Sequence, residues 1–354
     1  PTESCDYCGT GRATHLDLDE YPTVSLHNVA ETVPAEWADG GDRLRRVPAT
    51  VGEELNDMAR DRVGHATGGE LRFVPESDDA EVEVTLSAAE SAQVRTFWGG
   101  FQPWQPTEIG PEPRTLTLSV PERLRDLPVS PETGRFDPRV CRILFERVPA
   151  VAVHDVSGDC RPPEPEELPD RRYLAYGTSI TEGAAASATH TNYVTHVARN
   201  CGYDALNFGS SGSAYCEAAM AEYIGSRDDW DLATLALSVN MANTGEFAPE
   251  TFHERADAFV NTIAEAQPEK PVVCVTLFPY FDDLIDSGDA EHARAYRDAL
   301  RSIVAESPHD NVTLVEGSEL MEVSGLGADL LHPGDHGMKM IGEKLADRLE
   351  AIVA

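Results

Sequence analysis

The stretch "RRYLAYGTSITEG", Arg171 to Gly183, joins an apolar run to a glycine-containing turn and a polar segment. The run Tyr173–Tyr176 predicts a strand, and Gly177 permits a tight turn directly after it. Ser179 then enters the N-terminus of a helix, where free backbone N–H groups can stabilise a negatively charged oxygen. Serine also caps helices at such positions, so the stretch alone leaves two interpretations open, a nucleophile and a helix cap.

Strand and helix patterns alternate from this stretch to the end of the chain. Further apolar runs that predict strands lie at 204–208, 232–239, 271–278 and 311–317. Each is followed by an amphipathic segment that predicts a helix. Five strand–helix units predict a parallel sheet with helices on both faces, a three-layer α/β/α domain over residues 171–354. Ligands of such sheets bind beyond the carboxyl ends of the strands.

The first 160 residues show a different pattern, in which short runs alternate between apolar and polar residues. Val82, Val84 and Leu86, for example, share one face of an expected strand. Such runs at regular spacing predict a β-sandwich or jelly-roll domain over residues 1–160, with one helix expected at 50–69. The polar segment 161–170 contains four prolines and predicts the linker between the two domains.

An aromatic cluster, Trp98, Phe101 and Trp104, surrounds two glycines in this first domain. Exposed aromatic rings can stack on carbohydrate, whereas aromatic residues of a β-domain more often fill its core. We favour the core interpretation for all three side chains.

The chain of 354 residues carries 62 acidic and 28 basic residues, a formal net charge of −34. Such a charge repels nucleic acid and anionic membranes, so we expect neither as a partner. No apolar run approaches the ~20 residues of a membrane helix. Only Lys270, Lys339 and Lys344 are lysines, and acidic residues are spread along the whole chain. This composition is typical of salt-accumulating halophiles, whose molar salt screens self-repulsion.

Seven cysteines, an odd number, are scattered through the chain. This usage favours reduced thiols and a cytoplasmic location, although a leader removed before Pro1 stays open. Cys5 and Cys8 form a CxxC pair that His15 or His27 could complete as a zinc site. No second pair follows at the usual spacing, so an ordinary turn is the preferred interpretation. We therefore expect neither a metal nor another cofactor.

Glycine and amide residues follow the second and third strands of the predicted sheet. The second strand ends in "NFGSSGSA", in which Gly209 and Gly212 can expose backbone N–H groups. The third ends in "SVNMAN", where the Asn240 amide can donate to a developing negative charge. Each feature is equally compatible with an ordinary turn when taken alone.

The last strand leads to "GADLLHPGDHG", in which Asp329 and His332 are three residues apart. A carboxylate can hold an imidazole in the tautomer that accepts a serine proton. A metal site of His332 and His336 with Asp329 or Asp335 is the alternative. Pro333 and Gly334 interrupt the helix that such a pair needs, so we disfavour this metal site.

These four segments together resemble the motif blocks of the SGNH, or GDSL-like, hydrolase superfamily. "YGTSITEG" matches the first block, "NFGSSG" the second, "LSVNMA" the third and "DLLHP" the last. The resemblance implies that Ser179 is the nucleophile of a triad with His332 and Asp329. It also implies a flavodoxin-like three-layer α/β/α fold for residues 171–354 and an oxyanion hole built from Ser179, Gly212 and Asn240.

The resemblance further implies a serine esterase or deacylase that forms an acyl-enzyme from a small-molecule ester. The expected substrate carries a short acyl group, for example an O-acetyl group on a carbohydrate or on another small alcohol. The whole chain is similar to two-domain members with an N-terminal β-sandwich. Thr178 replaces the usual Asp, and "Ser-Val-Asn-Met" replaces the usual third block, so the substrate cannot be carried over. An acyltransferase with the same triad and a non-catalytic carbohydrate-binding protein are the alternatives.

Overall fold

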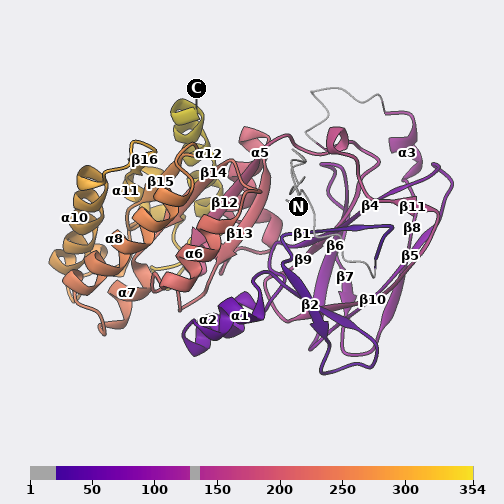
Figure 1. The fold of residues 1–354 in the computed structure, drawn as a ribbon, viewed down its shortest axis with the longest axis horizontal. Coiled ribbons are helices and arrows are strands. Elements are labelled where there is room, and N and C mark those ends of the chain that lie inside the picture. The colour runs from indigo at the N-terminus through magenta and orange to yellow at the C-terminus, as the bar shows by residue number, and fades with distance from the viewer. Residues whose placement is uncertain (1–20, 128–135, 354) are drawn as a thin grey trace, which may run out of the picture.

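The computed structural model of the protein describes residues 21–127 and 136–353. An N-terminal β-rich part with two antiparallel sheets precedes a C-terminal part with one parallel sheet and helices (Figure 1). This arrangement confirms the fold class predicted from the alternation of strand and helix patterns. The Cys5–Cys8 pair and His15 lie outside the described residues.

The two N-terminal sheets enclose one hydrophobic core. One sheet has the order β1–β4–β9–β6–β7, with β11 paired to β4. Its strands are β1 (Ser25–His27), β4 (Glu70–Pro75), β6 (Ala92–Trp98), β7 (Thr107–Ile109), β9 (Cys141–Phe145) and β11 (Cys160–Arg161). The other sheet, in the order β2–β3–β10–β5–β8, consists of β2 (Glu31–Pro34), β3 (Asp42–Arg45), β5 (Val82–Ala88), β8 (Arg114–Leu118) and β10 (Val151–Gly158). Val84 of one sheet and Ile143 of the other are fully buried in this core, which accounts for the apolar alternation.

Two expectations for the N-terminal part are wrong in detail. The expected helix at 50–69 is two short helices, α1 (Ala49–Glu53) and α2 (Asp57–Val63). Asn56 separates them because its side chain accepts a hydrogen bond from the Ala59 N–H and so begins a new helix. In the aromatic cluster only Trp98 lies in the core, whereas Phe101 is 38% exposed and Trp104 is 98% exposed. A third short helix, α3 (Glu122–Arg125), follows β8.

The parallel sheet has the strand order β13–β12–β14–β15–β16. Its strands are β12 (Arg172–Gly177), β13 (Asp204–Gly209), β14 (Leu232–Ala236), β15 (Val272–Val275) and β16 (Val312–Val315). Numbered along the C-terminal part this order is 2-1-3-4-5, the flavodoxin-like arrangement. The order reverses between β12 and β14, and the crevice beyond the carboxyl ends of these two strands is where such sheets bind ligands.

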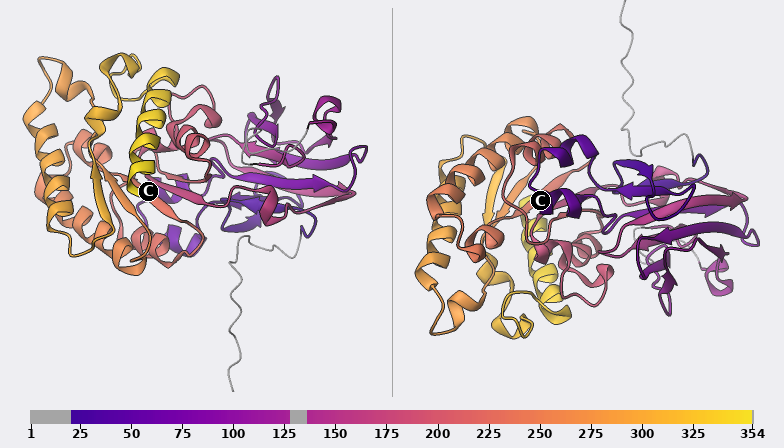
Figure 2. Two further views of the ribbon diagram at one scale, coloured as in Figure 1. Left: turned by 90° about the horizontal axis from the view of Figure 1, so that it is seen from above. Right: turned by 90° about the horizontal axis from the view of Figure 1, so that it is seen from below.

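Helices cover both faces of this sheet (Figures 1 and 2). On one face α5 (Tyr193–Cys201) packs against α12 (Asp335–Val353), and on the other α6 (Ala218–Ser226), α8 (Pro249–Ala266) and α10 (Ala290–Glu306) lie side by side. The remaining short helices of the C-terminal part are α4 (Ser179–Glu182), α7 (Val239–Thr244), α9 (Phe281–Leu284) and α11 (Gly317–Leu320). Within the described residues, none of the helices is both long and apolar enough to span a bilayer.

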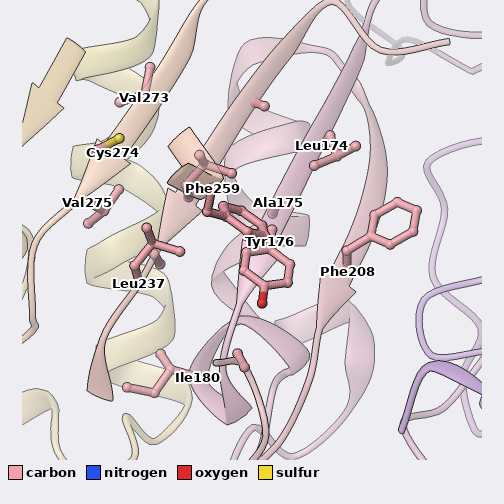
Figure 3. Close-up of a cluster of buried hydrophobic side chains, with 14 of the residues drawn as sticks. Leu174, Ala175, Tyr176, Ile180, Phe208, Leu237, Phe259, Val273, Cys274 and Val275 are labelled. Atoms are coloured by element: carbon pink, nitrogen blue, oxygen red, sulfur yellow. The ribbon is translucent and has the colours of Figure 1, made fainter. Parts of the chain in front are cut away.

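The core of the C-terminal part lies between the sheet and its helices. Figure 3 shows Tyr176 of β12 beside Phe259 of α8, and their rings stack with centroids 4.6 Å apart. Strand β14 is buried at every position, as its largely apolar sequence predicts for a central strand. This packing fixes the carboxyl ends of β12 and β14, where the polar motifs follow.

The N-terminal part also contributes side chains to this C-terminal core. Val47, Leu55, Ala59 and Val63, in and around α1 and α2, belong to the same hydrophobic cluster as the strands of the parallel sheet. Figure 1 shows α1 and α2 apart from the N-terminal sheets, close to α6. The α1–α2 segment therefore lies between β3 and β4 of the N-terminal part in the sequence but packs on the C-terminal part.

Candidate active site

A chain of hydrogen bonds links Ser179, His332 and Asp329. Ser179 Oγ lies 2.8 Å from His332 Nε2, and His332 Nδ1 lies 2.7 Å from Asp329 Oδ2. The three residues come from opposite ends of the C-terminal part, 153 positions apart between Ser179 and His332. In this geometry the carboxylate orients the imidazole, and the imidazole can accept the serine proton.

Ser179 is the first residue of α4, directly after β12. The preceding Thr178 has extended backbone angles, and its hydroxyl accepts a hydrogen bond of 3.4 Å from the Ile180 N–H. Thr178 is therefore the helix cap, so the capping role does not fall to Ser179. No described residue accepts a hydrogen bond from the Ser179 N–H, which leaves this donor free at the helix N-terminus.

The loop before α12 holds Asp329 and His332 in a tight turn. Asp329 Oδ1 accepts bonds of 3.1 Å from the backbone N–H groups of Leu331 and His332. Leu330, the residue directly after Asp329, has a φ of 52°, a left-handed conformation that is uncommon for leucine. Partial burial of the Asp329 carboxyl acts to raise its pKa, but the hydrogen bonds from His332 and Leu331 outweigh it and lower the pKa below its usual value. The carboxylate is thus kept ionised beside His332.

Gly212 lies in the turn that follows β13. Its φ is 71°, which favours glycine, and its carbonyl accepts a bond of 3.0 Å from the Tyr215 hydroxyl. Among the described residues, none accepts a hydrogen bond from the Gly212 N–H. A Cβ built on Gly212 would lie 2.9 Å from the Sδ of Met58, an exposed residue of α2. The α1–α2 segment therefore borders this turn.

Asn240 follows β14 in the first turn of α7. Its Oδ1 accepts a bond of 3.2 Å from the Ala214 N–H, which ties the side chain to the turn that contains Gly212. This bond fixes the orientation of the amide, whose Nδ2 group is its hydrogen-bond donor. Ser238, two residues before it, has a φ of 97°, a strained value of the kind found at functional sites. Ser238 caps α7, which begins at Val239, so Asn240 lies in its first turn, four residues after the end of β14.

The predicted residues therefore meet at one edge of the sheet. A hydroxyl with an imidazole partner lies at the end of β12, and the free Gly212 N–H and the Asn240 amide follow the two strands beside it. Donors of this kind are what a developing oxyanion requires, and a hydroxyl–imidazole–carboxylate chain is what acyl transfer requires.

Asp335 and His336, the other two residues of the disfavoured metal alternative, lie outside this hydrogen-bond chain. Asp335 begins α12 and accepts a bond of 2.7 Å from the Ser187 N–H, and His336 is exposed. His27, considered above for zinc, is buried and lies 2.7 Å from the carbonyl oxygen of Ala205. Across residues 21–127 and 136–353 no group of three or more His, Cys, Asp or Glu side chains is arranged to hold a metal ion.

Three residues near the site were not singled out from the sequence: Glu182, Ser211 and Arg46. Glu182 is completely buried and accepts hydrogen bonds from Ser211 in the turn of Gly212. Arg46 reaches the same region from the N-terminal part. In the sequence, Glu182 could have been noticed as a charged residue in the predicted first helical turn after "GTS". No local sequence pattern marks Arg46.

Comparison with solved structures supports the two-part fold along almost the whole chain. A salicylyl-acyltransferase, SsfX3, from a tetracycline biosynthetic pathway aligns with a TM-score of 0.70 and 15% identity, over 94% of this chain and 96% of that one. A family two carbohydrate esterase from Cellvibrio japonicus aligns at 0.63 and 13% identity, over 94% and 95%. A family two carbohydrate esterase from Clostridium thermocellum, in complex with cellohexaose, aligns at 0.60 and 15% identity, over 80% and 92%. At these identities the likeness concerns the fold.

Comparison at the sequence level identifies a family for the C-terminal part. No curated protein sequence matches the chain. Residues 170–353, just over half of its length, match the family described as GDSL-like lipase/acylhydrolase. The match covers every residue of the Ser179–His332–Asp329 chain as well as Gly212 and Asn240. The protein thus belongs to the GDSL-like lipase/acylhydrolase family.

Proposed function

We propose that this protein is a serine esterase that hydrolyses short-chain carboxylic esters through an acyl-enzyme. The observation that carries the proposal is the Ser179–His332–Asp329 hydrogen-bond chain, with distances of 2.8 and 2.7 Å. The family membership of residues 170–353 is consistent with this chemistry.

In the proposed acylation step, Ser179 Oγ attacks the ester carbonyl carbon while His332 Nε2 takes its proton. Asp329, held ionised by its hydrogen bonds, stabilises the imidazolium that forms. The carbonyl oxygen becomes an oxyanion and accepts hydrogen bonds from the Ser179 and Gly212 N–H groups and the Asn240 amide. The C–O bond then breaks, and the leaving alkoxide takes the proton from His332.

In the proposed deacylation step, water attacks the acyl carbon of the Ser179 ester. His332 accepts the proton of the water and returns a proton to Ser179 Oγ as the carboxylic acid leaves. An alcohol in place of water would give a new ester by the same steps. Product analysis with competing alcohols separates these outcomes, because hydrolysis releases the acid and transfer conserves the ester.

The substrate class we propose is an ester of a short acyl group with a carbohydrate or another small alcohol. Two fold relatives named as carbohydrate esterases support this class, and a relative named as a salicylyl-acyltransferase makes the acceptor worth testing. The formal charge of −34 favours neutral alcohol moieties over anionic ones, since a field of this sign repels anions.

The test is turnover of p-nitrophenyl esters of increasing acyl length and of acetylated sugars, measured in molar salt. We expect activity that is greatest for the shortest acyl groups and is lost in Ser179→Ala. Full activity of Ser179→Ala would overturn the proposal. Activity that remains unchanged in EDTA would in addition separate this mechanism from a metal-dependent one.

A further inference from the structure

We propose that Glu182 is a positioning residue for the turn after β13 that contains Gly212, and that Arg46 of the N-terminal part holds the end of β13 that leads into this turn. The inference rests on the proposed function, since it concerns the N–H group of Gly212 as an oxyanion donor. By this inference the N-terminal part influences catalysis at a site whose proposed catalytic residues all lie in the C-terminal part.

The carboxylate of Glu182 binds the turn at two points. Its Oε2 accepts a bond of 3.1 Å from the Ser211 N–H and a further bond from the Ser211 hydroxyl. Glu182 is the last residue of α4, the helix that begins at Ser179, and its side chain is completely buried. One short helix therefore carries both the hydroxyl of the site and the carboxylate that anchors the turn beside it.

Ser211 directly precedes Gly212, so its anchoring fixes the peptide whose N–H is the proposed donor. The Ser211 N–H is directed to Glu182, whereas the next N–H along the chain, that of Gly212, has no acceptor among the described residues. Oxyanion donors stabilise the transition state because they need no reorganisation at the moment of reaction. Loss of the anchor would let the turn sample other geometries and weaken that stabilisation.

The strand before the turn is held by Arg46, which follows β3. The Arg46 guanidinium is 1% exposed and donates to the carbonyl oxygens of Asn207 and Gly209 at 2.9 and 3.1 Å. Its other bonds, both 2.8 Å, go to the carbonyl oxygens of Arg62 and His65. Arg46 thus connects the segment around α2 to the last residues of β13.

Arg46 also supplies a positive charge to Glu182, from 3.9 Å. Burial lowers the pKa of Arg46 to about 10, and the charge of Glu182 opposes this shift, so the guanidinium stays charged at neutral pH. Arg147, a second residue of the N-terminal part, lies 3.7 Å from Glu182 and donates to the Ser211 hydroxyl at 3.4 Å. The buried carboxylate is thereby balanced by guanidinium groups from the N-terminal part.

The close approach of strand and helix leaves little freedom in this arrangement. A Cβ built on Gly209 would lie 2.1 Å from the backbone nitrogen of Glu182. Asn207 adds a bond of 2.8 Å from its Nδ2 to the carbonyl oxygen of Thr181. The end of β13 and the backbone of α4 are therefore in direct contact, and a shift in one moves the other.

The experiment compares Glu182→Gln with Glu182→Asp, because these variants separate the effect of side-chain length from the effect of charge. Glutamine keeps an oxygen at the same distance from the backbone and can still accept from Ser211, whereas aspartate keeps the charge but is one methylene shorter. We expect the kcat for p-nitrophenyl acetate to fall about tenfold or more in Glu182→Asp, part of the ~10²–10³ that loss of an oxyanion donor costs. In Glu182→Gln we expect a fall of only about threefold, with KM little changed in both variants.

A second readout is the Ki of phenylboronic acid, which adds to the nucleophilic serine as a tetrahedral anion and so probes the oxyanion hole. Its Ki should rise in Glu182→Asp by a factor similar to the fall in kcat. Glu146→Gln is the matched control, because Glu146 also joins the two parts, through bonds of 2.7 and 2.8 Å to Thr189, but does not contact the turn. Its kcat and Ki should stay within about twofold of wild type.

The result that overturns the inference is a Glu182→Asp variant with the kcat and Ki of Glu146→Gln. A fall in kcat without a rise in the boronate Ki would also overturn it, because the loss would then not involve the oxyanion hole. Greater activity in the aspartate than in the glutamine variant would likewise overturn it, because the charge of residue 182, and not its hydrogen bonds to Ser211, would then be the property required. Failure of the proposed function itself is seen separately, as retained activity in Ser179→Ala.

Discussion

Arg72 of β4 binds Asp204, the first residue of β13, through two parallel hydrogen bonds of 2.6 and 2.7 Å. Both side chains are buried, and Arg72 also donates to Glu70 at 2.6 Å. Arg142 of β9 binds the same Glu70 carboxylate. Two guanidiniums and two carboxylates thus form a balanced cluster between the N-terminal sheet and the edge strand of the parallel sheet.

Asp204→Asn should destabilise the protein by roughly 3–5 kcal/mol, the usual cost of leaving a buried partner charge uncompensated. Chemical denaturation at pH 7 measures this change. Asp57→Asn is the control, since Asp57 is 99% exposed in its 3.5 Å pair with Arg60 and its loss should cost less than about 1 kcal/mol. Equal effects of the two substitutions would contradict a structural role for the buried cluster.

Stability should fall as the pH drops below about 7 because of His27. Burial, together with the positive charge of Arg72, lowers the pKa of His27 from 6.5 to about 3, so its 3.3 Å contact with Asp204 is not an ion pair at neutral pH. Between pH 6.5 and 3 the unfolded chain binds a proton that the folded protein does not, and stability therefore rises with pH in this window.

This single group should remove roughly 2 kcal/mol of stability between pH 7 and pH 5. The measurement is the free energy of unfolding at both pH values in wild type and in His27→Gln. Glutamine can still donate to the carbonyl of Ala205 but does not titrate, so the pH slope should become smaller. An unchanged slope would show that His27 is not responsible.

Asn240→Ala should lower kcat by roughly 10²–10³ while KM stays close to wild type, because the amide acts on the oxyanion and not on the ground state. Steady-state kinetics with p-nitrophenyl acetate provides the measurement. Asn243→Ala, in the same helix α7 but at an exposed position, is the control. A larger change in KM than in kcat would assign Asn240 to substrate binding instead.

Salt should stabilise the protein, because a net charge of −34 repels itself in dilute buffer. At 1 M salt the Debye length is about 3 Å, so this repulsion is largely screened. We expect the melting temperature to rise by on the order of 5 °C between 0.1 and 2 M KCl. A melting temperature that is flat or falls with KCl would contradict the halophile interpretation of the composition.

The fold of the C-terminal part and its polar strand ends could be predicted because their signals are local. A largely apolar run marks β14, and the residues that follow each strand are adjacent in sequence to it. Ser179 and Asn240 could therefore be placed at one sheet edge before the strand order was known. The order itself, with β12 between β13 and β14, carries no local signal.

The residues that the sequence did not reveal act across long separations. Arg46 bonds Gly209 over 163 positions, and Ser211 bonds Glu182 over 29, so neither contact has a short-range pattern. The prediction that Trp104 lies in the core was wrong. Aromatic residues are buried on average, but this average does not determine the position of a single loop residue.

We propose that Ser179 is a nucleophile activated by His332. The most direct measurement is covalent labelling with diisopropyl fluorophosphate, followed by intact mass and peptide mass spectrometry. We expect one phosphoryl group per chain on the peptide that contains Ser179, no label in Ser179→Ala, and much slower labelling in His332→Ala. A label on a different residue of the active enzyme, or rapid labelling without His332, would contradict it.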